Sequence, residues 1–146
     1  MPVPAIWGPK LWAVLHGIGA RAGKNSKALR IDEAREIKWL LDHLETIIPC
    51  PECRQHIQAY RQATGLPSNT YDTGLWLSKF HNAVNSRLSK VEVPFTEDLG
   101  KETNIIDSWI AYQNVLKESM FKGTVQGKSL ADWNRHLRMW MGFCGC

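Results

Sequence analysis

Residues 40–57 read LLDHLETIIPCPECRQHI, and this stretch decides the fold class. Its apolar side chains recur at helical spacing as far as Ile48, which is the pattern of a helix with one buried face. Pro49 ends that helix, and Pro51 is placed to open a short new helix that carries Cys53. The stretch therefore predicts two helices separated by a break, with a pair of cysteines at the start of the second.

Helical spacing continues on both sides of this stretch. Asp32 is a suitable N-cap for the helix that Pro49 ends, and Pro9 suits the first turn of an earlier helix. Asp72 is expected to cap a fourth helix, and Ser129 the last one. The apolar faces expected for the first, fourth, fifth and sixth helices are Leu11, Trp12, Leu15; Leu75, Trp76, Phe80, Val84, Leu88; Ile105, Trp109, Tyr112, Leu116; and Leu130, Trp133, Leu137, Trp140.

No strand-like alternation persists long enough to build a sheet, so we expect an all-α fold. Residues 91–100 contain the helix breakers Pro94 and Gly100 and are expected to form a connector. The length of 146 residues fits one domain, and 44% hydrophobic residues with 22% charged residues argue against general disorder. The net charge of +4 suits an anionic small molecule as well as nucleic acid and decides neither.

The four cysteines form two close pairs, Cys50 with Cys53 and Cys144 with Cys146. Pairs this close enclose almost no loop, so we expect a redox or metal role for them rather than a purely structural one. Cys50 lies near the N-cap of its helix, where the helix end favours thiolate over thiol. The sulfurs of residues three apart on a helix are neighbours and are able to form a disulfide. Four thiolates holding zinc are the alternative.

Two further groups of residues share the helical spacing. Gly8, Trp12 and His16 recur every four residues, so a gap, a flat ring and an imidazole line up on one helix face. His81 and Asn85 share a face of a later helix among apolar neighbours. These polar groups either bond to neighbouring helices within the core or face a heterocyclic ligand between helices.

Residues 17–22 match the G-x-G-x-x-A dinucleotide-binding pattern letter for letter. That pattern binds a pyrophosphate only in a turn between a strand and a helix, whereas here it lies inside a helical stretch. We therefore predict that its small residues allow another helix to pack closely.

Taken in order, the motifs resemble those of the Erv/ALR family of FAD-linked sulfhydryl oxidases. The family order is W-G-x-x-x-W-x-x-x-H, then C-x-x-C followed by a His, then H-N-x-V-N-x-x-L-x-K, found here within residues 7–16, 50–56 and 81–90. The resemblance covers about residues 6–92. It implies a four-helix bundle that holds FAD over residues 1–92. Residues 93–146 would be a helical extension, packed on the bundle as one domain.

The resemblance also implies roles for individual residues. Cys53 would be the sulfur beside the flavin, and Cys50 the sulfur attacked by an incoming thiolate. The FAD site implied by the family comprises Gly8, Lys10, Trp12, His16, His56, Tyr60, His81, Asn82, Val84, Asn85, Leu88 and Lys90. Side-chain chemistry suggests two further members of the site. Arg87 is a third cation for the pyrophosphate, beside Lys10 and Lys90. Trp76 is a second ring, beside Trp12, that covers the adenine or flavin faces.

The function implied is oxidation of protein dithiols to disulfides, with two electrons passed through FAD to molecular oxygen to give hydrogen peroxide. Members commonly carry a second, mobile dithiol, and Cys144-Gly145-Cys146 would be this shuttle on an unanchored tail; spare terminal thiols are the alternative. The implied partners are reduced proteins or a thioredoxin-like carrier, and a second copy paired through the first two helices. We expect no bound metal, nucleic acid or membrane.

The chain departs from cellular members of the family in two ways. It lacks their widely spaced cysteine pair downstream of the H-N-x-V-N motif, and residues 93–143 are longer than the usual tail. It thus resembles versions encoded by large cytoplasmic DNA viruses. Because no signal peptide or membrane-spanning run is visible, we expect a cytoplasmic location, with a viral assembly site or virion also compatible. The competing class is a non-enzymatic, zinc-stabilised helical interaction module.

Overall fold

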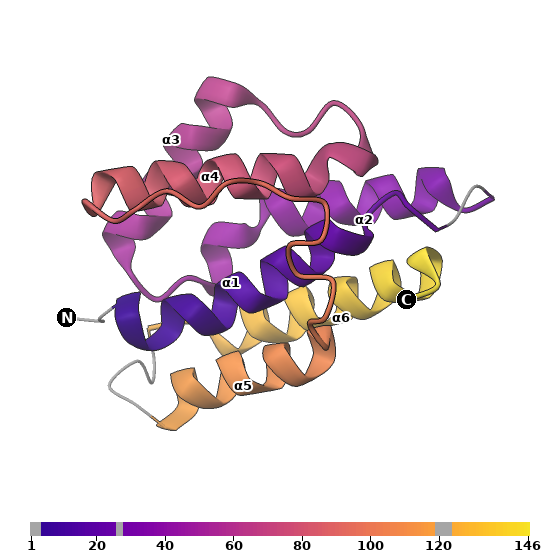
Figure 1. The fold of residues 1–146 in the computed structure, drawn as a ribbon. Helices are drawn as coiled ribbons and strands as arrows, with labels where there is room; N and C mark the ends of the chain where they lie inside the picture. Colours follow the sequence, from indigo (N-terminus) through magenta and orange to yellow (C-terminus); the bar gives the residue numbers. More distant parts are fainter. Residues whose placement is uncertain (1–3, 26–27, 119–123) are drawn as a thin grey trace.

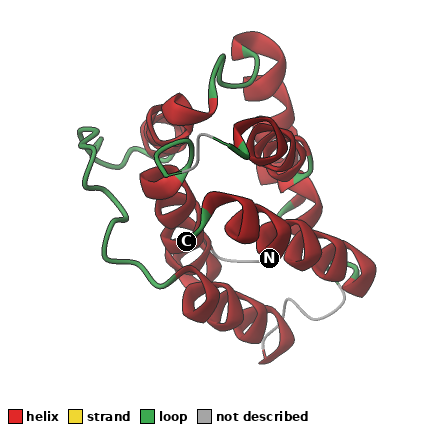
Figure 2. Ribbon diagram, turned by 90° about the vertical axis from the view of Figure 1, so that its right-hand side faces the viewer, coloured by secondary structure: helices red, strands yellow, loops and turns green. Residues whose placement is uncertain are grey.

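The computed structural model describes residues 4–25, 28–118 and 124–146, and these residues form helices and loops without a strand (Figures 1 and 2). The helices, in chain order, are α1 (Pro4–Arg21), α2 (Arg30–Asp42), the 3-10 helix η1 (Leu44–Ile47), α3 (Pro51–Thr64), the 3-10 helix η2 (Thr70–Asp72), α4 (Thr73–Arg87), α5 (Ile105–Glu118) and α6 (Gly127–Cys144). The predicted all-α fold is confirmed. None of the described helices is long and apolar enough to cross a membrane.

Helices α5 and α6 pack directly on the first two helices. Figure 1 shows α1 between α4 and α5, and α2 packs along α6. Trp109 of α5 and both Trp133 and Trp140 of α6 are fully buried in the same core as Leu15 of α1 and Leu40 of α2. The C-terminal helices therefore occupy much of the surface through which α1 and α2 were expected to pair with a second copy.

Small residues set the closest helix contacts. A Cβ added to Gly19 of α1 would lie 2.7 Å from the Cα of Gly74 in α4, and one added to Gly17 would lie 2.9 Å from Ile105 of α5. Only glycine allows the backbones of α1 and α4 to approach this closely. The prediction that the G-x-G pattern serves helix packing is confirmed.

Three expected helix starts are wrong, and one expected helix end is wrong as well. Helix α2 stops at Asp42 and the 3-10 helix η1 follows it, so Pro49 does not end α2. Helix α1 begins at Pro4, so Pro9 lies inside it. Helix α2 has Leu29 at its N-cap, and Asp32 lies in its first turn, where a negative charge also favours the helix dipole. Helix α6 begins at Gly127, two residues before Ser129. Asp72 does occupy the N-cap of α4, but its side chain forms no capping hydrogen bond.

The last turn of α6 is anchored in the core. Cys144 is 1% exposed, forms a disulfide with Cys146, and its Sγ lies 3.7 Å from the carbonyl oxygen of Arg21 at the end of α1. One turn earlier, the Trp140 indole N–H donates to the buried Glu33 carboxylate at 3.0 Å. The expectation of an unanchored tail is therefore wrong, because the aromatic face of α6 is buried up to the cysteine.

Candidate active site

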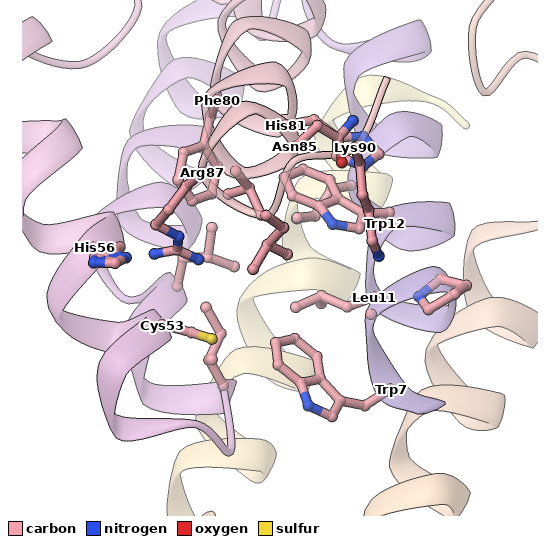
Figure 3. A pocket seen from close by; sticks show the side chains of 17 residues that line it. Trp7, Leu11, Trp12, Cys53, His56, Phe80, His81, Asn85, Arg87 and Lys90 are labelled. Carbon is pink, nitrogen blue, oxygen red and sulfur yellow. The ribbon is translucent and has the colours of Figure 1, made fainter. Parts of the chain in front are cut away.

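A cavity of about 240 Å³ lies between α1, η1, α3 and α4. Its walls are mostly aromatic and aliphatic, with a cysteine, two histidines and two cations placed among them (Figure 3). The lining residues are Trp7, Gly8, Pro9, Leu11, Trp12, Leu15, Leu44, Ile48, Cys53, His56, Phe80, His81, Val84, Asn85, Arg87, Leu88 and Lys90. None of these residues is acidic, so the cavity suits a flat apolar ring system that carries negative charge nearby.

One member of the C-x-x-C pair, Cys53, lies at the wall of this cavity. Cys50 is the N-cap of α3, and its Sγ accepts a hydrogen bond from the backbone N–H of Cys53 at 3.2 Å. Both thiols are free; Cys50 is only 7% exposed, and Cys53 lines the cavity. As predicted, Pro51 opens the helix, and this break in the chain presents the pair at a helix end.

The surroundings of Cys53 favour its protonated form. Burial, followed by the hydrogen bond and charge of Cys50, raises the pKa of Cys53 to about 12, and Glu52 acts in the same direction. Arg87 opposes this rise through its positive charge. Burial is therefore the largest of the influences on the Cys53 thiol.

An aromatic stack forms another part of the wall. The Trp12 and His81 rings are nearly parallel, with centroids 3.8 Å apart, and His16 Nε2 lies 2.9 Å from His81 Nδ1. Burial, followed by the charges of His16 and Lys90, lowers the pKa of His81 to about 4, and burial also lowers the pKa of His16. Both imidazoles are therefore neutral near pH 7, and one donates to the other.

The cavity brings together nine of the residues predicted to hold the cofactor: Gly8, Trp12, His56, His81, Val84, Asn85, Arg87, Leu88 and Lys90. The other five do not line it: Lys10, His16, Tyr60, Trp76 and Asn82. Leu88, expected on the inner side of α4, is instead exposed at its C-cap beside the cavity.

The residues outside the cavity have other contacts. The Asn82 amide forms two hydrogen bonds of 2.8 Å with the backbone of Val93 and so holds the connector against α4. The Trp76 indole N–H donates to the carbonyl of Gly65 at 2.9 Å, and this ring does not line the cavity. Lys10 is exposed on α1, beside α5. His16 lies behind the Trp12–His81 stack and contacts the site through His81.

Sequence reasoning did not assign a cofactor role to Trp7, which is 6% exposed and lines the cavity. Its indole N–H and the Nδ1 of His56 are buried without a hydrogen-bond partner among the described residues. Buried polar atoms without a partner are rare in native structures and often indicate an absent ligand or water. Leu44 and Ile48 were also missed, because their apolar spacing fits any buried helix face.

The structure does not bring the four cysteines together. Cys53 lines a cavity with Trp7 and Gly8 of the first turns of α1, whereas Cys144 contacts Arg21 at the other end of that helix. The interval from Gly8 to Arg21 corresponds to about 20 Å of helix at about 1.5 Å per residue. Among the described residues, no group of three or more histidine, cysteine or acidic side chains could hold a metal ion. The tetrathiolate zinc alternative is therefore not supported.

A thiol pair at a helix N-terminus, next to an aromatic cavity with two cations, is an arrangement for dithiol redox chemistry with a bound ring system. Residues 9–109 match the model of the Erv1 / Alr family. The chain is 32% identical over 126 residues to the FAD-linked sulfhydryl oxidase of African swine fever virus (isolate Pig/Kenya/KEN-50/1950), covering 84% of this chain and 90% of the viral protein. The chain belongs to the Erv1/Alr family, as its motifs predicted, and is an enzyme of the thiol oxidase class.

More distant relatives have related names. The chain is 26% identical over 125 residues to rice Sulfhydryl oxidase 1, covering 85% of this chain and 22% of the rice protein. It is 28% identical over 94 residues to a putative FAD-linked sulfhydryl oxidase of Invertebrate iridescent virus 3, covering 62% of this chain and 61% of the viral protein. No solved structure matches the chain.

Proposed function

We propose that this chain oxidises dithiols in protein substrates to disulfides, with FAD as its cofactor and molecular oxygen as the final electron acceptor, giving hydrogen peroxide. The observation that carries the proposal is the position of Cys53. It belongs to a C-x-x-C pair and lines a cavity walled by Trp7, Trp12 and Phe80. The family match and the viral relative named as a FAD-linked sulfhydryl oxidase support the same chemistry.

The residues of the cavity fit a flavin. Trp7, Trp12 and Phe80 offer flat apolar surfaces, while the unpartnered N–H of Trp7 and ring nitrogen of His56 are available to polar atoms of a ring system. Lys90 lies beside the Trp12–His81 stack and supplies a positive charge for a pyrophosphate (Figure 3). FAD, when bound, supplies a two-electron acceptor whose reduced form reacts with oxygen. Thiols alone react with oxygen only slowly.

The two cysteines have different positions and, in our proposal, different roles. In the oxidised pair, a substrate thiolate attacks Cys50 Sγ, the Cys50–Cys53 bond breaks, and Cys53 leaves with the bonding electron pair. The second substrate thiolate then attacks the substrate sulfur of the mixed disulfide and releases Cys50. The substrate is oxidised by two electrons, the pair is reduced by two, and the substrate's thiol protons go to the solvent or to the released thiolates. Cys53, which lines the cavity, is then the sulfur that faces the cofactor.

We propose that the Cys144–Cys146 pair is a shuttle that accepts electrons from bulky substrates. Cys146 is exposed, whereas Cys50 is largely buried, so a folded protein has easier access to the terminal pair. Since Cys144 is anchored at the opposite end of α1 from the cavity, the shuttle of one molecule serves the Cys50–Cys53 pair of another. The homodimer expected from the sequence remains a prediction, as do a thioredoxin-like carrier and a cytoplasmic location.

A spectrum and an oxygen electrode test the proposal. The purified protein is expected to be yellow, with flavin absorption in the blue, and to consume oxygen in step with the hydrogen peroxide that it forms from a small dithiol. The Cys53→Ser variant is expected to keep the flavin and lose dithiol oxidation. A colourless protein that contains stoichiometric zinc, or full activity in the variant, would overturn the proposal.

A further inference from the structure

The two cations of the cavity serve different ends of it. Lys90 is close enough to His81 to lower the pKa of that imidazole, and Figure 3 shows its side chain beside Trp12 and His81. Arg87, three residues earlier, instead acts on Cys53, and the same view shows its guanidinium on the side of the cavity where Cys53 and His56 lie. From the sequence, both Lys90 and Arg87 were predicted to bind the pyrophosphate.

The Arg87 guanidinium is also available to interact with a negative charge that develops in the cavity. It forms no ion pair or hydrogen bond with any of the described residues, and none of the residues that line the cavity is acidic. It projects from the last turn of α4 towards the side of the cavity where Cys53 and His56 of α3 lie. The ionisable groups that influence Cys53 are Cys50 and Glu52 of the α3 N-terminus and Arg87 of α4, and of these only Arg87 favours a negative sulfur.

We infer that Arg87 is the residue that stabilises the thiolate of Cys53 when the Cys50–Cys53 disulfide opens, and that Lys90 alone of the two serves the nucleotide end. The inference rests on the proposed function, since it assigns a role within that reaction. When a substrate thiolate attacks Cys50, the sulfur–sulfur bond breaks and both of its electrons leave on Cys53. Thiolates of lower pKa leave faster. A guanidinium beside a half-buried sulfur therefore speeds this step, acting through Cys53 as a positioning residue.

The test measures the Cys53 thiol directly and needs no turnover. In a Cys50→Ala background of the FAD-loaded protein, with the Cys144–Cys146 disulfide intact, the rate of Cys53 alkylation by iodoacetamide is followed against pH by mass spectrometry of the Cys53 peptide. Arg87→Gln is expected to move the midpoint of this profile up by about one pH unit, or to leave about tenfold less thiolate at a given pH, because an opposite charge has been removed. Arg87→Lys keeps a positive charge at this position and is therefore expected to return the midpoint most of the way to the parent value.

Two control variants separate this role from others. Lys79→Gln removes a charge from an exposed site on the same helix and is expected to leave the profile unchanged. Lys90→Gln is expected to weaken FAD binding and, when FAD is added to saturation, to leave the profile unchanged. If Arg87→Gln shows the same alkylation profile as its parent, the inference is wrong. If that variant also loses FAD, Arg87 is a nucleotide ligand instead. If the parent protein fails to oxidise dithiols while the profile still shifts, the proposed function fails and the assignment of Arg87 stands.

Discussion

At the scale of single residues, the site depends on side chains whose charge is controlled by burial. Cys53 is held as a thiol, and His81 is held neutral between Trp12, His16 and Lys90. A neutral imidazole is able both to donate and to accept, which a charged one is not. The His16–His81 hydrogen bond that positions the stacked ring therefore needs at least one neutral ring as its acceptor, and it is lost when both imidazoles are charged.

This state of His81 predicts a dependence of stability on pH. Its folded pKa of about 4 lies below the ordinary value of 6.5, so between these limits the unfolded chain binds more protons than the folded one. The free energy of unfolding is therefore expected to fall as the pH is lowered from 6.5 towards 4. Thermal unfolding of the flavin-free protein across this range measures the effect, and His81→Gln is expected to reduce the slope. An equal slope in the two proteins would show that His81 does not titrate as described.

At the scale of helices, the site depends on how closely α1 and α4 approach. Trp12 comes from α1 and His81 from α4, and the crossing that brings their rings together is the contact of Gly19 with Gly74. The Asn82 amide holds the connector that follows α4 against the same helix; Figure 2 draws this connector as a loop, in green. Helix α4 thus contributes to the cavity, to the α1 contact and to the course of the connector.

Gly19→Ala is expected to destabilise the fold. The added methyl group would meet the Gly74 backbone, which has no flexible side chain to move aside, and such overpacking costs about 1–3 kcal/mol. Gly142→Ala is the matched control, since a Cβ there meets nothing within 4 Å and alanine stabilises a helix by up to about 1 kcal/mol. Urea unfolding of both variants measures the difference. Equal stability of Gly19→Ala and the parent protein would mean that the helices cross farther apart.

At the scale of the whole molecule, the two cysteine pairs lie at opposite ends of α1. Helices α5 and α6 pack on α1 and α2 and end by placing the Cys144–Cys146 disulfide against Arg21, away from the cavity (Figure 1). The same packing covers the helices through which a second copy was expected to bind. In our proposal, electrons that enter at Cys146 therefore pass to Cys50 of another molecule.

Mixing two variants that each fail to oxidise a reduced protein tests this relay. The Cys144→Ala/Cys146→Ala variant is expected to retain oxidation of a small dithiol, which attacks Cys50 directly, and to lose most oxidation of a reduced protein. Cys53→Ala is expected to lose both activities. A mixture of the two variants is expected to regain oxidation of the reduced protein, because the terminal pair of one serves the Cys50–Cys53 pair of the other. If the double variant keeps both activities, the terminal pair is passive; if the mixture stays inactive, the relay does not pass between molecules.

The sequence by itself determined the all-α fold, the thiol pair at the start of α3, the close packing of small residues in α1 and the family. Each of these follows from local signals, such as apolar spacing, proline positions and motif order, which are present in a short window of chain. Tertiary structure alone decided that Arg87 faces Cys53 while Lys90 lies beside His81, that Trp76 and Asn82 contact backbone instead of the cavity, and that Cys144 is buried far from Cys50. These outcomes depend on how helices cross, and crossings are set by close contacts between residues distant in sequence, such as Gly19 with Gly74. A periodic pattern shows which residues share a face, but it does not show which neighbour that face meets.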